Sequence, residues 1–240
     1  MCTVTFVIEK KGQIIITSSR DEQSTRPQAL KPQKILLNEK NILFPKDEKA
    51  GGTWFVVDEL GNALVLLNGG FEPHIQQKTY RKSRGLIVLD IFAEKNILLT
   101  FDEIDLEDIE PFTLILWTKE NFLYELIWDG IAKYSQILDH KKPHIYSSVT
   151  LYKPEIRAKR KKWFESFLEQ NKQISASLLQ KFHTTTQTND TENGLVINRN
   201  NQVKTYSVTQ VTIDDKKINM VHQDLLAQKT YDEEFTLIFS

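Results

Sequence analysis

Short segments of alternating apolar and polar residues, joined by turn residues, recur along the chain and constrain its fold more than any other feature. Residues 3–9 alternate in this way, residues 10–13 have the composition of a turn, and a second strand is expected from Ile14. Similar pairs of segments occupy residues 53–67 and 112–128. Two such segments around a short turn are typical of an antiparallel hairpin. The sequence therefore predicts antiparallel sheets.

Helical patterns lie between the hairpins. Ser83 is a candidate cap for a helix through Phe92, and Pro154 precedes apolar residues at helical spacing up to Leu168. Residues 21–50 are polar and contain three prolines, so we expect them to be irregular. Neither a repeat nor a flexible linker is evident, and residues 1–240 are predicted to form one α+β domain. The remaining predicted elements are a helix at 176–182 and strands at 144–149, 195–197, 203–213, 217–221 and 235–239.

The overall composition excludes several classes of protein. The chain of 240 residues carries 31 basic and 32 acidic side chains, a net charge of -1, which gives no basic excess for binding nucleic acid. One cysteine cannot form an internal disulfide, and this fits a reducing compartment, so a cytoplasmic location is expected. We expect no signal peptide, no transmembrane segment, no metal site and no cofactor.

The single cysteine follows the initiator methionine. Removal of Met1 would leave Cys2 with its α-amine beside its own thiol, which is a nucleophile and a base in one residue. The alternative is a buried residue of the first strand, because free cysteines are often buried. Position alone does not separate the two interpretations.

The first hairpin brings candidate catalytic partners to Cys2. Residues equidistant from the turn pair across a hairpin, so Cys2 and Arg20 are expected at the same end of the ladder. Arg20 would favour the thiolate, and Asp21 would accept a hydrogen bond from the α-amine. The alternative is an exposed ion pair at the end of a strand, which stabilises little.

Two further segments are candidates for the walls of a site. Gly51 and Gly52 permit positive φ angles and close backbone approach before Thr53 and Trp54, and the Trp54 ring is a candidate pocket wall. Asn68 follows the next strand, where its amide would donate to an oxyanion. A plain turn, with a core tryptophan and a strand-capping asparagine, would give the same residues.

Several motifs in order resemble the NRDE family, also called the transport and Golgi organisation 2 family. The segments concerned are MCTVTF at 1–6, SSRDEQSTRP at 18–27, GGTWFVVDELGNALVLLNG at 51–69 and KSRGLIVLDIF at 82–92. A collinear set of this kind is more specific than any one motif. The segment at 146–164 is similar to bacterial members more loosely.

The resemblance implies an N-terminal nucleophile hydrolase-like fold, a four-layer αββα sandwich with two antiparallel sheets between helix layers. It also implies relatives that cleave non-peptide amide bonds with an N-terminal cysteine, such as bile-salt hydrolases and penicillin V acylases. Carried over residue by residue, Cys2 falls on the nucleophile, Arg20 and Asp21 on the supporting box, and Asn68 on an oxyanion-hole asparagine. The expected ligand is a small-molecule amide, a thioester or a lipid-like molecule.

The sequence departs from the family pattern at three places, and two other functions stay open. Ser19 replaces the asparagine of the box, and neither YSSVT at 146–150 nor TYSVTQ at 205–210 carries the second asparagine or arginine of the hydrolases. A non-catalytic carrier of lipid, acyl-CoA or haem would keep the pocket without the chemistry. An interaction module would use the basic face of the helix at 157–162, which is otherwise expected to be solvated.

Overall fold

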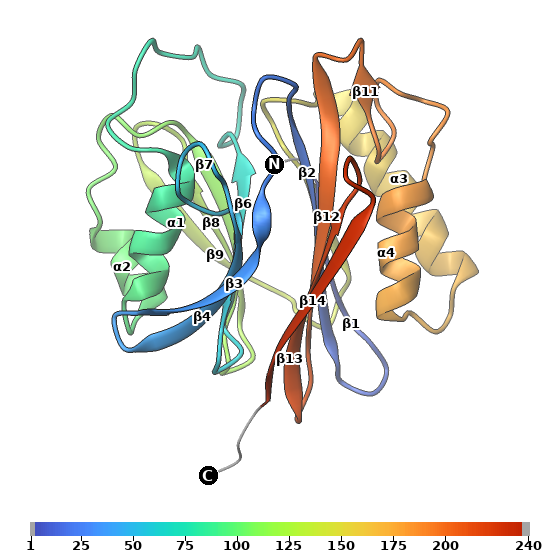
Figure 1. Cartoon of the computed structure of the whole chain (residues 1–240), viewed down its shortest axis with the longest axis horizontal. Coiled ribbons are helices and arrows are strands. Elements are labelled where there is room, and N and C mark those ends of the chain that lie inside the picture. The colour runs from blue at the N-terminus through green and yellow to red at the C-terminus, as the bar shows by residue number, and fades with distance from the viewer. Residues whose placement is uncertain (1–2, 237–240) are drawn as a thin grey trace.

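Residues 3–236 are described by the computed structural model, and they form two antiparallel sheets between two pairs of helices (Figure 1). Helix α1 (Arg84–Ala93) packs on one sheet with α2 (Ile97–Glu103) beside it. Helices α3 (Pro154–Gln170) and α4 (Ala176–Thr185) pack on the other sheet. The predicted four-layer αββα arrangement is therefore confirmed.

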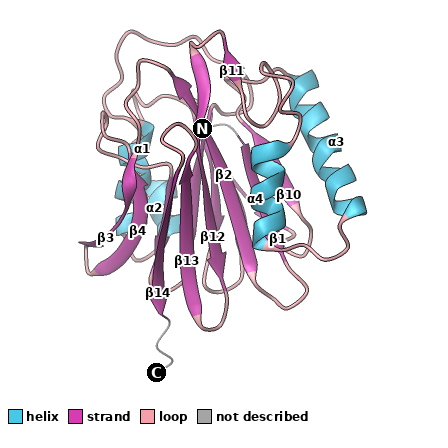
Figure 2. Ribbon diagram, turned by 45° about the vertical axis from the view of Figure 1, so that its right-hand side comes forward, coloured by secondary structure: helices cyan, strands magenta, loops and turns pink. Residues whose placement is uncertain are grey.

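The first sheet contains both ends of the described chain, and α3 and α4 cover its outer face (Figure 2). Its strands are ordered β10-β1-β2-β12-β13-β14, and β11 also pairs with β12. The hairpin of β1 and β2 has the predicted register, in which Thr3 pairs with Ser19 and Ile8 with Ile14. The strands are β1 (Thr3–Ile8), β2 (Ile14–Gln23), β10 (His144–Ser147), β11 (Asn198–Arg199), β12 (Val203–Ile213), β13 (Lys217–Asp224) and β14 (Lys229–Thr236).

The second sheet is a meander in which each strand pairs with the next one along the chain. Its strands are β3 (Leu30–Leu37), β4 (Lys40–Lys46), β5 (Phe55–Asp58), β6 (Ala63–Asn68), β7 (Phe112–Trp117), β8 (Leu123–Trp128) and β9 (Lys133–Leu138). Strand β9 and helix α2 were not predicted from the sequence.

The prediction of irregular structure at residues 21–50 is wrong. Strand β2 continues to Gln23, and β3 and β4 form a hairpin within this segment. Pro32 and Pro45 are opposite each other beside a shift of register, and β3 is an edge strand, where proline is tolerated. The residues Ile42, Leu43 and Phe44 of β4 are buried and supply the apolar surface that holds the hairpin in place.

Alternate residues of β1 and β2 pack into two different cores. Val4, Phe6 and Ile16 join the core between the sheets, where the Phe6 ring lies 5.4 Å from that of Trp117. Val7 and Ile15 pack under α3 and α4 instead. Burial of both faces makes this hairpin a rigid support for the side chains at its open end.

A register shift interrupts the pairing of β12 with β2 between Thr205 and Ser207. Thr205 is opposite Asp21, whereas Ser207 is opposite Arg20. An extra residue of this kind re-aims the side chains of a strand, and such bulges are frequent beside functional sites.

Candidate active site

A cavity of about 680 Å³ lies where β2, β6 and the start of α1 meet. Six of the predicted site residues line it: Arg20, Asp21, Gly52, Thr53, Trp54 and Asn68. Gly51 does not line the cavity, although both of its neighbours do. Cys2, the predicted nucleophile, lies outside the described residues, and the chain is described from Thr3 onward.

Arg20 is buried between the two sheets. Only 1% of its surface is exposed, and Nη2 donates a hydrogen bond to Asp47 Oδ2 at 2.6 Å. Its guanidinium carbon lies 4.9 Å from the centroid of the Trp54 ring, a cation–π arrangement. Because Arg20 is buried, the alternative of an exposed ion pair at a strand end is wrong. A buried charge needs a fixed partner, and Asp47 provides it.

Asp47 also binds a second arginine. Arg26 donates to both of its oxygens, from Nε to Oδ2 at 2.8 Å and from Nη2 to Oδ1 at 2.9 Å. Burial alone would raise the pKa of Asp47, but the hydrogen bonds from Arg26 and the Ala50 N–H bring its pKa below the usual value. This carboxylate therefore stays ionised and holds both guanidinium groups at the cavity.

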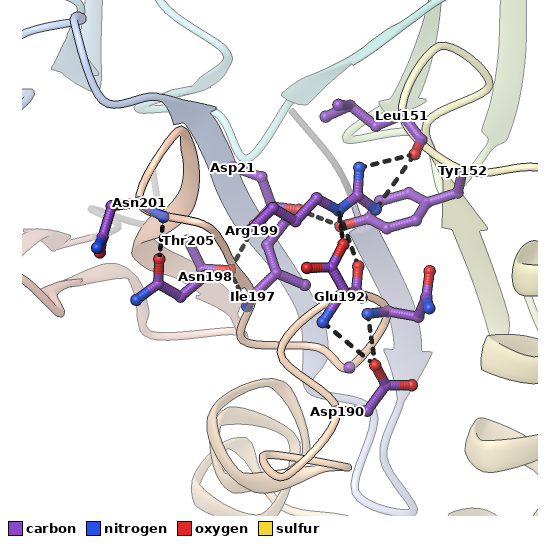
Figure 3. A network of polar contacts seen from close by, with 12 residues as sticks. Asp21, Leu151, Tyr152, Asp190, Glu192, Ile197, Asn198, Arg199, Asn201 and Thr205 are labelled. Carbon is purple, nitrogen blue, oxygen red and sulfur yellow. Dashed lines mark hydrogen bonds and ion pairs between the residues drawn. The ribbon is translucent and has the colours of Figure 1, made fainter.

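Asp21 faces the opposite side of β2 from Arg20. Tyr152 donates from its hydroxyl to Asp21 Oδ2 at 2.6 Å, and Thr205 donates to Oδ1 at 2.6 Å (Figure 3). The Tyr152 ring in turn lies between two guanidinium groups, with the carbon of Arg160 at 3.6 Å and that of Arg199 at 5.0 Å. Asp21 is thus held by hydroxyl groups from two elements distant in sequence.

Arg160 belongs to the face of α3 that was predicted to be solvated, and for this residue the prediction is wrong. It is 1% exposed, and it donates to Thr3 Oγ1 and to the Gly194 carbonyl, each at 2.5 Å. Its Nε and Nη2 also donate to the carbonyl of Asn193. The guanidinium therefore anchors the start of β1 from the helix side of the sheet.

A buried imidazole ties β1 to β2 on the same side. His183 in α4 makes hydrogen bonds to Thr5 Oγ1 at 2.9 Å and to Ser19 Oγ at 2.8 Å. Burial lowers the pKa of His183 to about 3, and the positive charge of Arg160 contributes. The imidazole is consequently neutral, with one ring nitrogen donating and the other accepting.

The two glycines before Trp54 have separate roles. Gly51 has a φ of 75°, which favours glycine, and a Cβ at this position would meet no atom within 4 Å. A Cβ at Gly52 would lie 2.2 Å from the carbonyl carbon of Gly85 at the start of α1. The predicted positive φ and close backbone approach are therefore both present, on adjacent residues. Thr53 donates to the carbonyl of Pro45 at 2.8 Å and so fixes the segment.

Asn68 and Ser148 meet at the end of β6. Ser148 is buried and donates to the backbone carbonyl of Asn68 at 2.9 Å. Ser148 lies in one of the segments that depart from the family pattern. Its hydroxyl binds the backbone of Asn68, the candidate oxyanion residue. This contact fixes the backbone from which the Asn68 side chain extends.

The opposite wall of the cavity carries a second ion-pair cluster. Glu110 accepts from Arg84 Nη2 at 3.0 Å and from His74 Nε2 at 3.2 Å. Burial lowers the pKa of Arg84, and the negative charge of Glu110 opposes that shift. Both walls of the cavity are therefore charged.

Sequence reasoning missed Asp47, Tyr152 and Arg160. Tyr152 and Arg160 lie within the loosely similar segment at 146–164, which was the one available signal for them. Asp47 was hidden in the segment predicted to be irregular. Each becomes part of the site through a contact with a residue at least 27 positions away.

No group of three or more His, Cys, Asp or Glu side chains in residues 3–236 is arranged to hold a metal ion. Within the same residues, no helix has the length and apolar character needed to cross a membrane.

Solved structures with little sequence similarity share this fold. An N-acylethanolamine-hydrolyzing acid amidase ortholog from Caenorhabditis elegans has a TM-score of 0.60 at 10% identity, over 87% of this chain and 92% of that chain. A mutant of the conjugated bile acid hydrolase from Clostridium perfringens has a TM-score of 0.57 at 9% identity, over 100% of this chain and 97% of that chain. The fold is thus N-terminal nucleophile hydrolase-like.

A family model is more specific than these structural likenesses. No curated protein matches the chain. The model described as Transport and Golgi organisation 2 matches residues 1–231, nearly the whole sequence. The chain therefore belongs to the transport and Golgi organisation 2 family.

Proposed function

We propose that this protein is an N-terminal cysteine hydrolase that cleaves a non-peptide amide or a thioester of a small molecule through an acyl-cysteine on Cys2. The observation that carries the proposal is the convergence of Arg20, Asp21 and Asn68 on one cavity beside the strand that begins at Thr3. Since Thr3 pairs with Ser19, the proposal puts the preceding residue, Cys2, opposite Arg20.

In the first half of the proposed reaction, Cys2 attacks the substrate carbonyl. Its thiol proton passes to its own α-amine, and a carbon–sulfur bond forms while the carbonyl oxygen becomes an oxyanion. Arg20 favours the thiolate, Asp21 holds the protonated amine, and the Asn68 amide donates to the oxyanion. The intermediate then collapses, and the α-ammonium gives its proton to the departing amine or thiolate.

In the second half, water releases the acyl group. The α-amine takes a proton from water, the hydroxide adds to the thioester carbonyl, and the carbon–sulfur bond breaks. The products are a carboxylic acid and the regenerated Cys2 thiol. This cycle requires removal of Met1, because a peptide bond at the Cys2 nitrogen would abolish its basicity.

The surroundings of the cavity favour this function over a carrier of lipid, acyl-CoA or haem. Sites for apolar cargo are lined mainly by hydrophobic side chains. Nine charged side chains line this cavity among the described residues: Arg20, Asp21, Glu22, Arg26, Asp47, Lys49, Lys82, Arg84 and Glu110. We place the reaction in the cytoplasm, on the ground that a free catalytic thiol needs a reducing compartment.

Intact-mass measurement tests the proposal directly, because Cys2 is the only cysteine. Protein from native expression is expected to lack Met1 and, after mixing with a panel of N-acyl amides and thioesters, to gain the mass of an acyl group. Cys2→Ala should gain no adduct and should cleave no substrate of the wild type. Full activity in Cys2→Ala would overturn the proposal, and a tightly held, unmodified ligand in both proteins would identify a carrier.

A further inference from the structure

Two buried hydrogen-bond donors at the cavity have no acceptor among residues 3–236. They are Arg20 Nη1 and Trp54 Nε1, in side chains that are 1% and 3% exposed and that both line the cavity. A buried donor without a partner is unfavourable because it has lost its hydrogen bonds to water, and native structures contain few of them. Such a pair at a cavity therefore indicates a group that binds there.

Both donors are held in fixed positions. Arg20 is anchored through Nη2 on Asp47, and the rings of Trp54 and Tyr206 lie within 4.9 and 5.6 Å of its guanidinium carbon. The Thr53 hydroxyl, bonded to the Pro45 carbonyl, fixes the backbone before Trp54. Donors fixed in this way lose little conformational entropy when a ligand binds.

Two hydroxyl groups lie beside Arg20 in the sheet, although neither lines the cavity. Ser18 and Ser207 are buried, and within the described part of the chain their Oγ atoms also have no partner. Ser207 is opposite Arg20 in the β2/β12 ladder, and Ser18 precedes Arg20 by two residues and so shares its face of β2. Four of the six unpartnered buried side-chain atoms among residues 3–236 are thus in this one region.

The charge of the cavity indicates the class of ligand. Five cationic and four anionic side chains line it among the described residues, so one negative charge on a ligand would neutralise the lining. A carboxylate brings that single charge and has two oxygens with about four acceptor positions. A neutral carbonyl would leave the positive charge, and a phosphate dianion would exceed it.

We propose that Arg20 Nη1 and Trp54 Nε1 bind a carboxylate of the substrate. If the hydrolase function proposed above holds, the substrates are amides or thioesters with a free carboxylate close to the bond that is cleaved. An N-acyl α-amino acid has this form, because one nitrogen and one carbon separate its carboxylate from the amide carbonyl. The carboxylate site itself does not depend on catalysis.

Binding is tested first without turnover, in the Cys2→Ala protein. The chain has four tryptophans, so ¹⁵N-labelled protein gives four indole N–H resonances, and Trp54→Phe identifies that of Trp54. N-acetylglycine is expected to shift the Trp54 resonance saturably. The Trp128 resonance serves as an internal control, because its Nε1 already donates to the Ile109 carbonyl at 2.8 Å. N-acetylglycinamide, which lacks the charge, should bind at least tenfold more weakly. An unmoved Trp54 resonance, or equal affinity for the two probes, would overturn the inference.

Turnover provides a second test. The ratio of kcat/KM for an N-acylglycine to that for the matching N-acylglycinamide should fall about tenfold in Trp54→Phe, which removes the donor and keeps an aromatic ring. Trp163→Phe, on the outer helix α3, should keep the wild-type ratio. Probe binding without any hydrolysis would reject the hydrolase and keep the carboxylate site. Hydrolysis through Cys2 with no preference for the carboxylate would reject the carboxylate site and keep the hydrolase.

Discussion

The guanidinium of Arg160 lies 3.6 Å above the ring of Tyr152, and the Tyr152 hydroxyl donates to Asp21 at 2.6 Å. A cation on α3 is thereby connected, through one aromatic ring, to the carboxylate at the end of β2. Arg160 also binds Thr3, the first described residue of β1. One buried guanidinium thus supports both sides of the proposed catalytic hairpin.

The Tyr152 hydroxyl is expected to stabilise the fold through Asp21. Tyr152→Phe removes one hydrogen bond to a buried carboxylate and keeps the ring under Arg160. Hydrogen bonds to charged groups contribute about 1.5–3 kcal/mol, so the free energy of unfolding should fall by that amount. Urea unfolding measures the change. Tyr124→Phe on β8 is the control, and an equal loss in the two variants would contradict the role assigned to Tyr152.

Arg160 and its neighbour Lys161 form a matched pair on α3. Arg160→Met leaves the Thr3 hydroxyl and two backbone carbonyls without their donor, so we expect a loss of at least about 3 kcal/mol. Lys161 is exposed, and Lys161→Met should change the free energy of unfolding by about 0.5 kcal/mol or less. Thermal unfolding of the two variants decides the matter, since similar melting temperatures would show that Arg160 is only a surface charge.

Gly51 and Gly52 should respond to alanine for different reasons. Gly51→Ala has room for its methyl group but must adopt a φ of 75°, which costs about 1–2 kcal/mol. Gly52→Ala would place Cβ 2.2 Å from the backbone of Gly85, and backbone atoms at the start of α1 do not yield as a flexible side chain would. We expect Gly52→Ala to be the more destabilising, as measured by chemical denaturation. The opposite order would mean that α1 shifts freely.

His183 should make stability depend on pH. Its pKa is about 3 in the folded protein and near 6.5 when unfolded, so between these values the unfolded chain binds a proton that the folded protein does not. Stability therefore falls as the pH is lowered from 6.5 towards 3, by up to about 1.4 kcal/mol per pH unit. His222, with a pKa of about 4, adds to the same trend. Urea titrations at several pH values should show a shallower slope for His183→Gln, and an unchanged slope would refute this assignment.

Local pattern and hairpin geometry predicted the parts of the site that lie on β2 and around Gly52. The pairing of Thr3 with Ser19 follows from the position of the turn alone, and it brings the start of the chain to Arg20 and Asp21. The need for glycine before Trp54 follows from backbone sterics. In both cases the relevant interaction is between residues whose relative positions are set by a short stretch of chain.

The partners of these residues could not be predicted in the same way. Asp47 reaches Arg20 because the polar segment before it folds into β3 and β4, where a few buried side chains outweigh its low propensity for strands. Arg160 lies among lysines on a helix, and a charge in that pattern is ordinarily solvated. The burial of Arg160 is made favourable by the carbonyls of residues 193 and 194 and by the Tyr152 ring. These contacts exist only in the folded protein.

The extra residue in β12 at Tyr206 shifts the register of that strand against β2. Val211 and Ile213, which are two residues apart, pack into the core between the sheets, while at the rim Thr205 donates to Asp21 and Ser207 is opposite Arg20. Substitutions at the rim are thereby insulated from the packing of the interior.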